Sequence, residues 1–163
     1  MKPAVAPFGS RGILLRPIRT DDLPLTLAWR NRDEARIWFK NSAPISEEGH
    51  RQWFEAYLRK ADDLHFIVEA NGVRVGQAAV YHFDGTTRSA EIGRFLIAPE
   101  ASGKGIMRMA VAHLLDLCRD ELGLERLYLD VFETNRKSIA LCRQCGFEET
   151  GRHGALLTMA RQL

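Results

Sequence analysis

Hydrophobic residues recur every three or four positions through the first third of the chain, which is the spacing of amphipathic helices. After a short β-rich run at 13–18, the pattern predicts a helix from Thr20 onward, with acidic residues in its first turn, and a second short helix over 34–39. Ser46 is placed to cap a third helix. The apolar residues expected to form the buried stripe of that helix are Trp53, Phe54, Tyr57 and Leu58.

The apolar period then changes from that of a helix to that of a strand. Runs at 64–70 and 73–80 flank Asn71-Gly72, which is the strongest short signal for a β-hairpin. A loop near Asp84-Gly85 leads to a further strand at 89–97. These three strands are expected to pair in succession and antiparallel.

Helical spacing returns after Gly103 and continues to about Leu122, and the apolar run at 126–132 predicts a strand buried on both faces. The strand at 89–97, this helix and the strand at 126–132 form a parallel crossover unit. A short helix over 138–145 and a last hairpin from 147 to 159 complete the chain. The pattern predicts one α+β domain over 1–163, with a mixed sheet of about six or seven strands and about four helices.

Composition narrows the class of protein. The 163 residues are 45% hydrophobic and 27% charged, with a net charge of +2. Lys and Arg form no basic run, so no nucleic-acid partner is expected. The longest uncharged run, 75–83, is far too short to span a membrane, and the N-terminus lacks the apolar core of a signal peptide. We expect a cytoplasmic protein, either a monomer or a homodimer, with no membrane partner.

Three cysteines are too few for a disulfide framework. Cys142-Arg-Gln-Cys145 has the spacing of a metal or redox pair, but no second pair stands at metal spacing elsewhere. Residues three apart also share one face of a helix and are buried together. We therefore expect a helix face and no metal.

A glycine-containing turn, Glu100-Ala-Ser-Gly103-Lys-Gly105, lies between the strand at 89–97 and the following helix. Two glycines let the backbone approach an anion, and a helix N-terminus offers unpaired N–H groups to phosphate. The P-loop pattern is absent, and the dinucleotide-binding pattern fails because Arg108 stands where its third glycine is needed. On these residues alone, a phosphate site and a simple helix start both remain open.

Three stretches resemble the GNAT superfamily of acetyl-CoA-dependent N-acetyltransferases. The run 90–115 resembles motif A of that family, whose loop reads Gln/Arg-x-x-Gly-x-Gly/Ala. Residues 129–135 followed by 138–147 resemble its second signature, a strand, an Asn and a helix ending in Gly-Phe. Leu15-Arg-Pro-Ile and Trp29-Arg-Asn-Arg-Asp resemble the branch that is similar to ribosomal-protein N-acetyltransferases. The resemblance covers almost the whole chain.

The resemblance implies a GNAT fold whose sheet is splayed between the fourth and fifth predicted strands, 89–97 and 126–132, with acetyl-CoA bound in the splay as cosubstrate. The part at about 88–150 is then expected to bind acetyl-CoA. Backbone of Leu96 to Ala98 is expected to pair with the pantetheine arm, and an N–H near Ile97 to stabilise an oxyanion. Asn135 is expected either to bond the cofactor arm or only to cap its helix. The cofactor-binding residues implied are Leu96, Ile97, Ala98, Ser102, Gly103, Lys104, Gly105, Ile106, Met107 and Asn135.

The same comparison nominates Glu91, Asp130 and Cys142 for catalysis. Glu91 is a candidate base, and by strand parity it shares a face with Gly93 and Phe95. The alternative is a glutamate that only faces solvent. Asp130 is the second candidate base. Cys142 stands where many relatives carry the Tyr that protonates the CoA thiolate, so either this thiol or water supplies the proton, or the thiol only packs. Glu100 replaces the usual Gln or Arg of the loop, which removes one side-chain contact to phosphate.

The N-terminal part, about 12–60, is expected to shape the acceptor site. Its residues 30–38 and 44–54 resemble acetyltransferases acting on UDP-linked amino sugars, such as those of pseudaminic acid synthesis. Arg30 is expected to bind a diphosphate, and His50 to bond a phosphate or ribose. Either Trp38 or Trp53 is expected to stack on a base or sugar. The competing interpretation places Trp38 and Trp53 in the core and pairs Arg30 with Asp33.

The predicted function is direct transfer of acetyl from acetyl-CoA to a primary amine, with a nucleotide-linked amino sugar as the expected acceptor. A peptide or protein N-terminus and a polyamine are the alternative acceptors. A catalytically silent acyl-CoA-binding domain is the non-enzymatic alternative.

Overall fold

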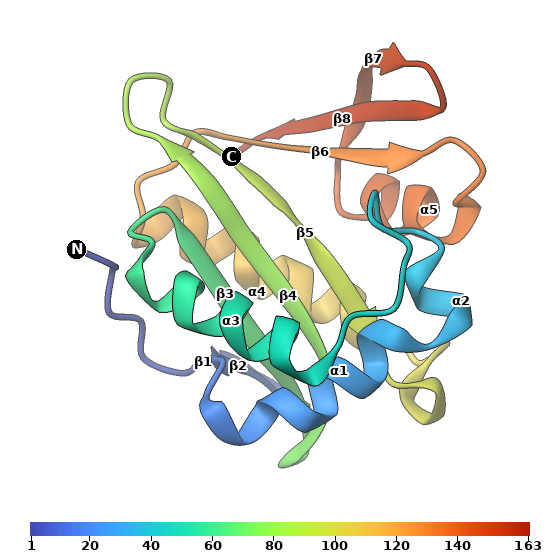
Figure 1. The fold of residues 1–163 in the computed structure, drawn as a ribbon. Coiled ribbons are helices and arrows are strands. Elements are labelled where there is room, and N and C mark those ends of the chain that lie inside the picture. The colour runs from blue at the N-terminus through green and yellow to red at the C-terminus, as the bar shows by residue number, and fades with distance from the viewer.

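Eight strands form one mixed sheet in the order β1-β2-β3-β4-β5-β6-β8-β7 in the computed structural model, which describes residues 1–163 (Figure 1). The strands are β1 (Phe8–Ser10), β2 (Ile13–Pro17), β3 (Asp63–Ala70), β4 (Val73–Asp84), β5 (Ser89–Ile97), β6 (Arg126–Phe132), β7 (Glu148–His153) and β8 (Leu156–Gln162). The helices are α1 (Leu23–Asn31), α2 (Asp33–Arg36), α3 (Glu47–Arg59), α4 (Ile106–Asp120) and α5 (Arg136–Gln144). Two short 3₁₀ turns, Thr20–Asp22 and Pro99–Ala101, precede α1 and α4.

The first five strands are antiparallel neighbours, and for β3, β4 and β5 the sequence pattern predicts this succession. Asn71 and Gly72 at the β3–β4 turn have φ values of 50° and 82°, the conformation of a type I′ hairpin turn. The edge strand β1 is an addition to the predicted set, because a three-residue strand carries too little pattern to be recognised.

The sheet divides between β5 and β6, as the resemblance implies. These two strands are parallel and pair only from Ser89–Arg126 to Glu91–Tyr128. On its other edge, β6 pairs with β8 over its whole length. The remainder of β5, after Glu91, has no strand partner on the edge that faces β6. Figure 1 shows the two strands separating toward the end where α2 and α5 lie.

A β-bulge interrupts β5 on the side that pairs with β4. Gln77 lies opposite Leu96 but Ala79 lies opposite Gly93, so β5 carries one extra residue between these pairs. Arg94 occupies the bulge with a φ of 55°. The predicted parity is wrong after Gly93, because residues directly opposite share a face and Leu96 therefore returns to the face expected for Phe95.

Helices cover both faces of the sheet: α4 lies behind it in Figure 1, and α1 and α3 lie in front. The α4 side chains Ala110, Leu114 and Cys118 are fully buried in the main core. Ile18, Phe54, Tyr57 and Ile67 form a smaller core beneath α3.

Two expectations of burial are wrong. Leu58 was placed in the buried stripe of α3 but is 53% exposed, while Phe54 and Tyr57 of that stripe are buried. Strand β6 was expected to be buried on both faces, yet only Leu127, Leu129 and Val131 are buried and the alternate positions are partly or fully exposed. The front helices α1 and α3 lie over the other half of the sheet, so no helix covers this face of β6 (Figure 1). None of the five helices combines the length and the hydrophobicity of a membrane span.

Candidate active site

The free edge of β5 presents backbone groups of alternate residues to the splay. The N–H of Ala98 donates to the carbonyl of Val75 on β4 at 2.6 Å, so Ala98 and Leu96 point their polar groups toward β4. Ile97 and Phe95 therefore point theirs away from β4 and into the splay. Of the predicted pairing residues Leu96, Ile97 and Ala98, only Ile97 has the orientation that a bound strand-like arm requires.

The loop before α4 displays a row of unbonded backbone N–H groups. Gly103 and Gly105 have φ values of 76° and 74°, and a Cβ at either position would meet no other atom within 4 Å. The first backbone bond into the helix is Met109 N–H to Gly105 O at 3.2 Å, and no backbone carbonyl accepts from the N–H groups of 103–108. Ser102 differs from the prediction, because its N–H already donates to Pro99 O. The loop therefore has the geometry of an anion cradle at a helix N-terminus, and we use that name for residues 103–108.

The N-terminal end of α5 carries two polar side chains, and one of them, Lys137, reaches this loop. Asn135 accepts a hydrogen bond from Ser138 N–H at 3.3 Å and caps the helix, while its amide nitrogen remains free to donate. Lys137, which was not predicted, donates from Nζ to Ser102 Oγ at 2.7 Å. An exposed ammonium at a phosphate-type loop adds positive charge where the backbone already favours an anion. A lysine in a helix has no sequence signal of its own for such a role.

Glu91 lies on the front face of β5 with its side chain 18% exposed, and its Oε2 is 2.9 Å from Nδ1 of His82. The His82 side chain is 63% exposed, so the pair connects the sheet surface to solvent. The pKa of Tyr81 is raised, first by burial and then by Glu91, which places this phenol beside the carboxylate. A Cβ on Gly93 would lie 2.8 Å from Tyr81 Oη, so the missing side chain makes room for the phenol.

Asp130 and Cys142 have surroundings of different kinds. Asp130 accepts from Thr158 Oγ1 at 2.7 Å and lies 3.5 Å from Lys40 Nζ, so the acceptor-side loop meets β6 at this carboxylate. Cys142 is buried on α5 with 2% of its surface exposed, and burial raises the pKa of its thiol to about 12. A thiol of that pKa is a weaker acid than an ordinary thiol near pKa 8.5.

Arg30, at the end of α1, is a buried cation without an anionic partner. Its Nη2 donates to Asn41 O at 2.5 Å and its guanidinium lies over the ring of Phe39 at 3.9 Å. Its Nη1 is buried and has no hydrogen-bond partner, and burial lowers the pKa of the group. The alternative pairing with Asp33 is not formed, because Asp33 bonds Arg36. The residue is 8% exposed, so the unused donor is a costly feature unless a ligand meets it.

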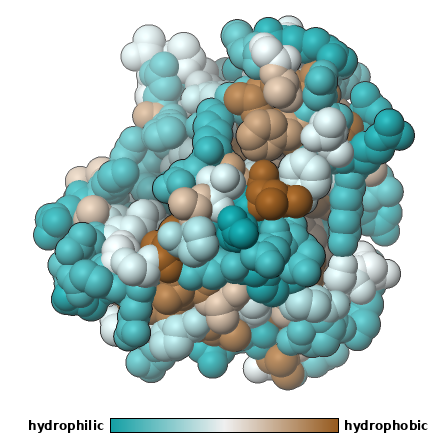
Figure 2. Space-filling model, turned by 45° about the vertical axis from the view of Figure 1, so that its right-hand side comes forward, coloured by the Kyte–Doolittle hydropathy of each residue, from teal (hydrophilic) through white to brown (hydrophobic).

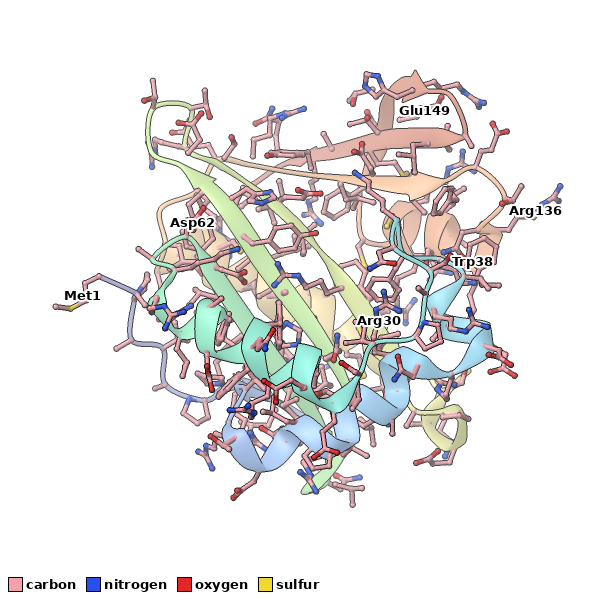
Figure 3. All side chains as sticks on the ribbon, in the orientation of Figure 1. Met1, Arg30, Trp38, Asp62, Arg136 and Glu149 are labelled. Carbon is pink, nitrogen blue, oxygen red and sulfur yellow. The ribbon has the colours of Figure 1, made fainter.

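His50 and Trp38, the other predicted acceptor residues, take different places. His50 is buried on α3, bonds Thr26 Oγ1 through Nε2 at 2.8 Å and stacks on Trp53 at 5.2 Å. Its pKa is lowered by burial and then by the nearby Arg30. Trp38 is exposed in the loop after α2, and Figure 3 shows it apart from Arg30. The structure therefore brings Arg30 and His50 together but leaves Trp38 outside that group.

Arg94 ties the bulge of β5 to β3, the strand on the far side of β4. Its guanidinium bonds both carboxylate oxygens of Asp63 on β3 at 2.8 and 3.1 Å, and it lies over Tyr81 at 4.1 Å. Gln77 Nε2 donates to the Arg94 carbonyl at 3.0 Å. Neither Asp63 nor Arg94 was singled out from the sequence, because their partnership depends on strand register.

The splay opens on the side of the molecule that carries α2 and α5. Figure 2 turns this side toward the viewer and shows hydrophobic atoms gathered at its centre, with hydrophilic atoms around them. An apolar centre with a polar rim is the usual surface of a small-molecule site.

A splayed mixed sheet with a free strand edge and an anion cradle before the crossover helix is the arrangement expected of an acyl-CoA-dependent transferase. The chain matches the family described as "Acetyltransferase (GNAT) domain" over residues 13–148. It belongs to this family and is an acyltransferase.

Three relatives illustrate the membership. The chain is 27% identical over 143 residues to the spermidine N(1)-acetyltransferase of Escherichia coli K12, covering 87% of this chain and 76% of that protein. It is 35% identical over 128 residues to Bacillus subtilis YdaF, named provisionally as a ribosomal N-acetyltransferase, covering 76% and 69%. The Vibrio cholerae spermidine N-acetyltransferase in complex with CoA and spermine has the same fold, with a TM-score of 0.85, 24% identity and coverage of 94% and 96%.

Proposed function

We propose that this enzyme transfers the acetyl group of acetyl-CoA directly to the primary amine of a small acceptor. The observation that carries the proposal is the presence of two sets of backbone groups without hydrogen-bond partners. One is the edge of β5 at Ile97, and the other is the N–H groups of 103–108. A pantetheine arm pairs with the first as an added strand, and a pyrophosphate binds the second. Asn135 and Lys137 supply side-chain donors between them.

In the reaction, the neutral amine attacks the thioester carbonyl, a C–N bond forms and the C–S bond breaks. The proton of the amine passes to Glu91, from which His82 leads to solvent, and Asp130 is the second candidate base. The thiolate must then gain a proton. Proton transfer from Cys142 is unfavourable because burial raises the pKa of its thiol to about 12. We therefore propose that water donates the proton to the thiolate and that Cys142 only packs in the core.

A polyamine is the first acceptor to test. The Escherichia coli and Vibrio cholerae relatives are named for spermidine, which supports the polyamine alternative better than the amino sugar expected from the sequence. Carboxylates are the groups that recognise a polyamine, and Glu91 and Asp130 face the acceptor side of the splay. Each already has a cationic or potentially cationic neighbour, His82 or Lys40, which a polyamine would displace.

An amine that also carries a phosphate or carboxylate is the second candidate acceptor, and Arg30 is the observation that favours it. This buried guanidinium has an unused donor and no carboxylate partner, which suits an anionic ligand and opposes a polycation. A nucleotide-linked amino sugar belongs to this class, with His50 as a neighbouring contact.

The test has two stages. Calorimetry with CoA and acetyl-CoA measures cofactor binding, and absence of binding to both contradicts the proposal. Thiol release from acetyl-CoA is then followed with spermidine, a UDP-linked amino sugar and a peptide with a free N-terminus. Release with spermidine alone supports the polyamine acceptor, and release with the UDP sugar alone supports the anionic acceptor. No release with any primary amine above the no-acceptor background contradicts amine acetylation.

A further inference from the structure

Arg32 connects the end of α1 to the free edge of β5. The residue lies at the junction between α1 and α2, with extended backbone angles of −61° and 138°. Its Nη2 donates to the carbonyl of Ile97 at 3.0 Å, across 65 residues of sequence. Its Nε is buried and has no hydrogen-bond partner. No ion pair involves Arg32, since its neighbour Asp33 bonds Arg36.

The position of this guanidinium is specific to the splay. Ile97, like Phe95, points its N–H and carbonyl away from β4, because in an extended strand these two groups of one residue point in the same direction. A cation bonded to the Ile97 carbonyl therefore lies beside the Ile97 N–H. The side chain is partly buried, so its charge is screened less than on an open surface.

We propose that Arg32 is a catalytic residue that, together with the Ile97 N–H, stabilises the negative charge that develops on the thioester carbonyl oxygen. The inference rests on the proposed acetyl transfer. When the amine adds, the carbonyl π electrons move onto oxygen, and they return when the C–S bond breaks. A preorganised cation and an N–H directed at that oxygen lower the energy of the charged intermediate more than that of the neutral thioester.

A structural role for Arg32 makes a different prediction. If the side chain only satisfies the Ile97 carbonyl and fixes the α1–α2 junction, a neutral amide donor should replace it. Arg32→Gln keeps a hydrogen-bond donor and removes the charge. Arg32→Lys keeps the positive charge but concentrates it on one ammonium group in place of the planar guanidinium. Arg36→Gln is the matched control, because Arg36 lies one turn further along, bonds Asp33 and the Ser42 carbonyl, and does not reach β5.

The first measurement separates binding from rate. We expect Arg32→Gln to lower kcat by about 10²- to 10³-fold, the usual effect of losing one oxyanion donor, while the Kd for CoA changes by less than about threefold. Arg32→Lys should recover part of kcat, and Arg36→Gln should leave both unchanged. An unchanged kcat in Arg32→Gln, or a loss of CoA affinity equal to the loss in kcat/KM, overturns the proposal.

The second measurement does not depend on turnover. Infrared difference spectra of acetyl-CoA carrying a ¹³C-labelled thioester carbonyl report the polarisation of that bond. We expect a lower stretching frequency on the wild-type protein than in water, and a smaller shift on Arg32→Gln. Equal shifts on both proteins overturn the assignment even if no acceptor amine is found. If the wild-type protein binds no acetyl-CoA, the proposed function fails, and the assignment of Arg32 fails with it.

Discussion

Asp63 on β3 and Arg94 in the bulge of β5 form a bidentate ion pair. Arg94 Nη1 donates to Asp63 Oδ1 at 2.8 Å, and Nη2 donates to Oδ2 at 3.1 Å. The Asp63 side chain is only 3% exposed, and Arg94 has a φ of 55°, a conformation that costs energy for a residue with a side chain. The pair therefore holds β5 in the register that turns Ile97 toward the splay. A bulge next to a site commonly redirects a strand in this way.

Removing one member of this pair should cost more than removing both. Asp63→Asn leaves a cation without its partner and should lower the free energy of unfolding by about 3 kcal/mol, whereas the double variant with Arg94→Gly leaves no unpaired charge and relieves the backbone strain. Urea unfolding of the wild type, both single variants and the double variant measures the coupling. Single effects that simply add would show that the pair does not act as a unit.

Gly103→Asp should weaken CoA binding at least about tenfold, since it places a carboxylate in the anion cradle and a side chain at a φ of 76°. Gly154→Asp is the matched control, because Gly154 has a φ of 59° in the distant β7–β8 turn and also has open space around its Cβ position. Calorimetric titration with CoA compares them. Equal affinity in Gly103→Asp and the wild type would remove the pyrophosphate from this loop.

Arg30→Met should leave the protein at least as stable as the wild type, because a methionine keeps packing on Phe39 and removes a desolvated, unpaired cation. The same variant should raise KM for an anionic acceptor about tenfold or more and leave KM for acetyl-CoA unchanged. Thermal unfolding and initial rates are the measurements. A variant that loses stability and keeps its acceptor KM would assign Arg30 to the fold alone.

His65 should make the protein sensitive to acid. Its ring is fully buried against Trp53 and Tyr57, neither nitrogen has a partner, and burial followed by Arg94 lowers its pKa to about 3. The unfolded chain takes up this proton near pH 6.5 and the native protein does not. Stability is therefore unaffected by this group above about pH 7 and falls as pH decreases from about 6.5 toward 3.

His65→Leu should remove that dependence. The unfolding constant of the wild type relative to the variant should rise close to tenfold for each pH unit below about 6. Urea titrations at pH 7, 6, 5 and 4 give the comparison, and His153→Leu, at an exposed position in β7, serves as the control. Parallel pH profiles for wild type and His65→Leu would mean that the buried ring is protonated in the native state.

Local signals explain why most of the fold was predictable. Asn71-Gly72 dictates a hairpin turn, Ser46 accepts from Gly49 N–H and caps α3, and the apolar spacing after Gly105 specifies a helix. The burial of β6 was not predictable in the same way. Its one exposed face results from the placement of the helices α1 and α3 over the other half of the sheet (Figure 1), and a hydrophobic run in the sequence does not record which faces the helices cover.

In the candidate site, too, the residues with a local sequence signal were predictable and those that depend on the fold were not. The conformation of the loop before α4 was predictable because Gly103 and Gly105 carry a backbone signal in the sequence itself. Arg32, Arg94 and Lys137 were missed because each acts on a residue brought close only by folding. The bulge also has no signature in the sequence, since a non-glycine residue occupies it. Because the bulge adds one residue to β5, every side chain after it lies on the opposite face from the one that simple alternation predicts.

The three residue pairs that join β5 to β6 make the sheet two hydrogen-bonded units with a short common boundary. One unit contains β1 to β5 and the other contains β6, β8 and β7. Each unit can then open with its own free energy, and a ligand arm that bridges the splay supplies the missing contacts between them. We expect CoA to slow amide hydrogen exchange most in β6 and in the second half of β5. The cofactor would then act as a removable strand that makes two weakly coupled units unfold as one.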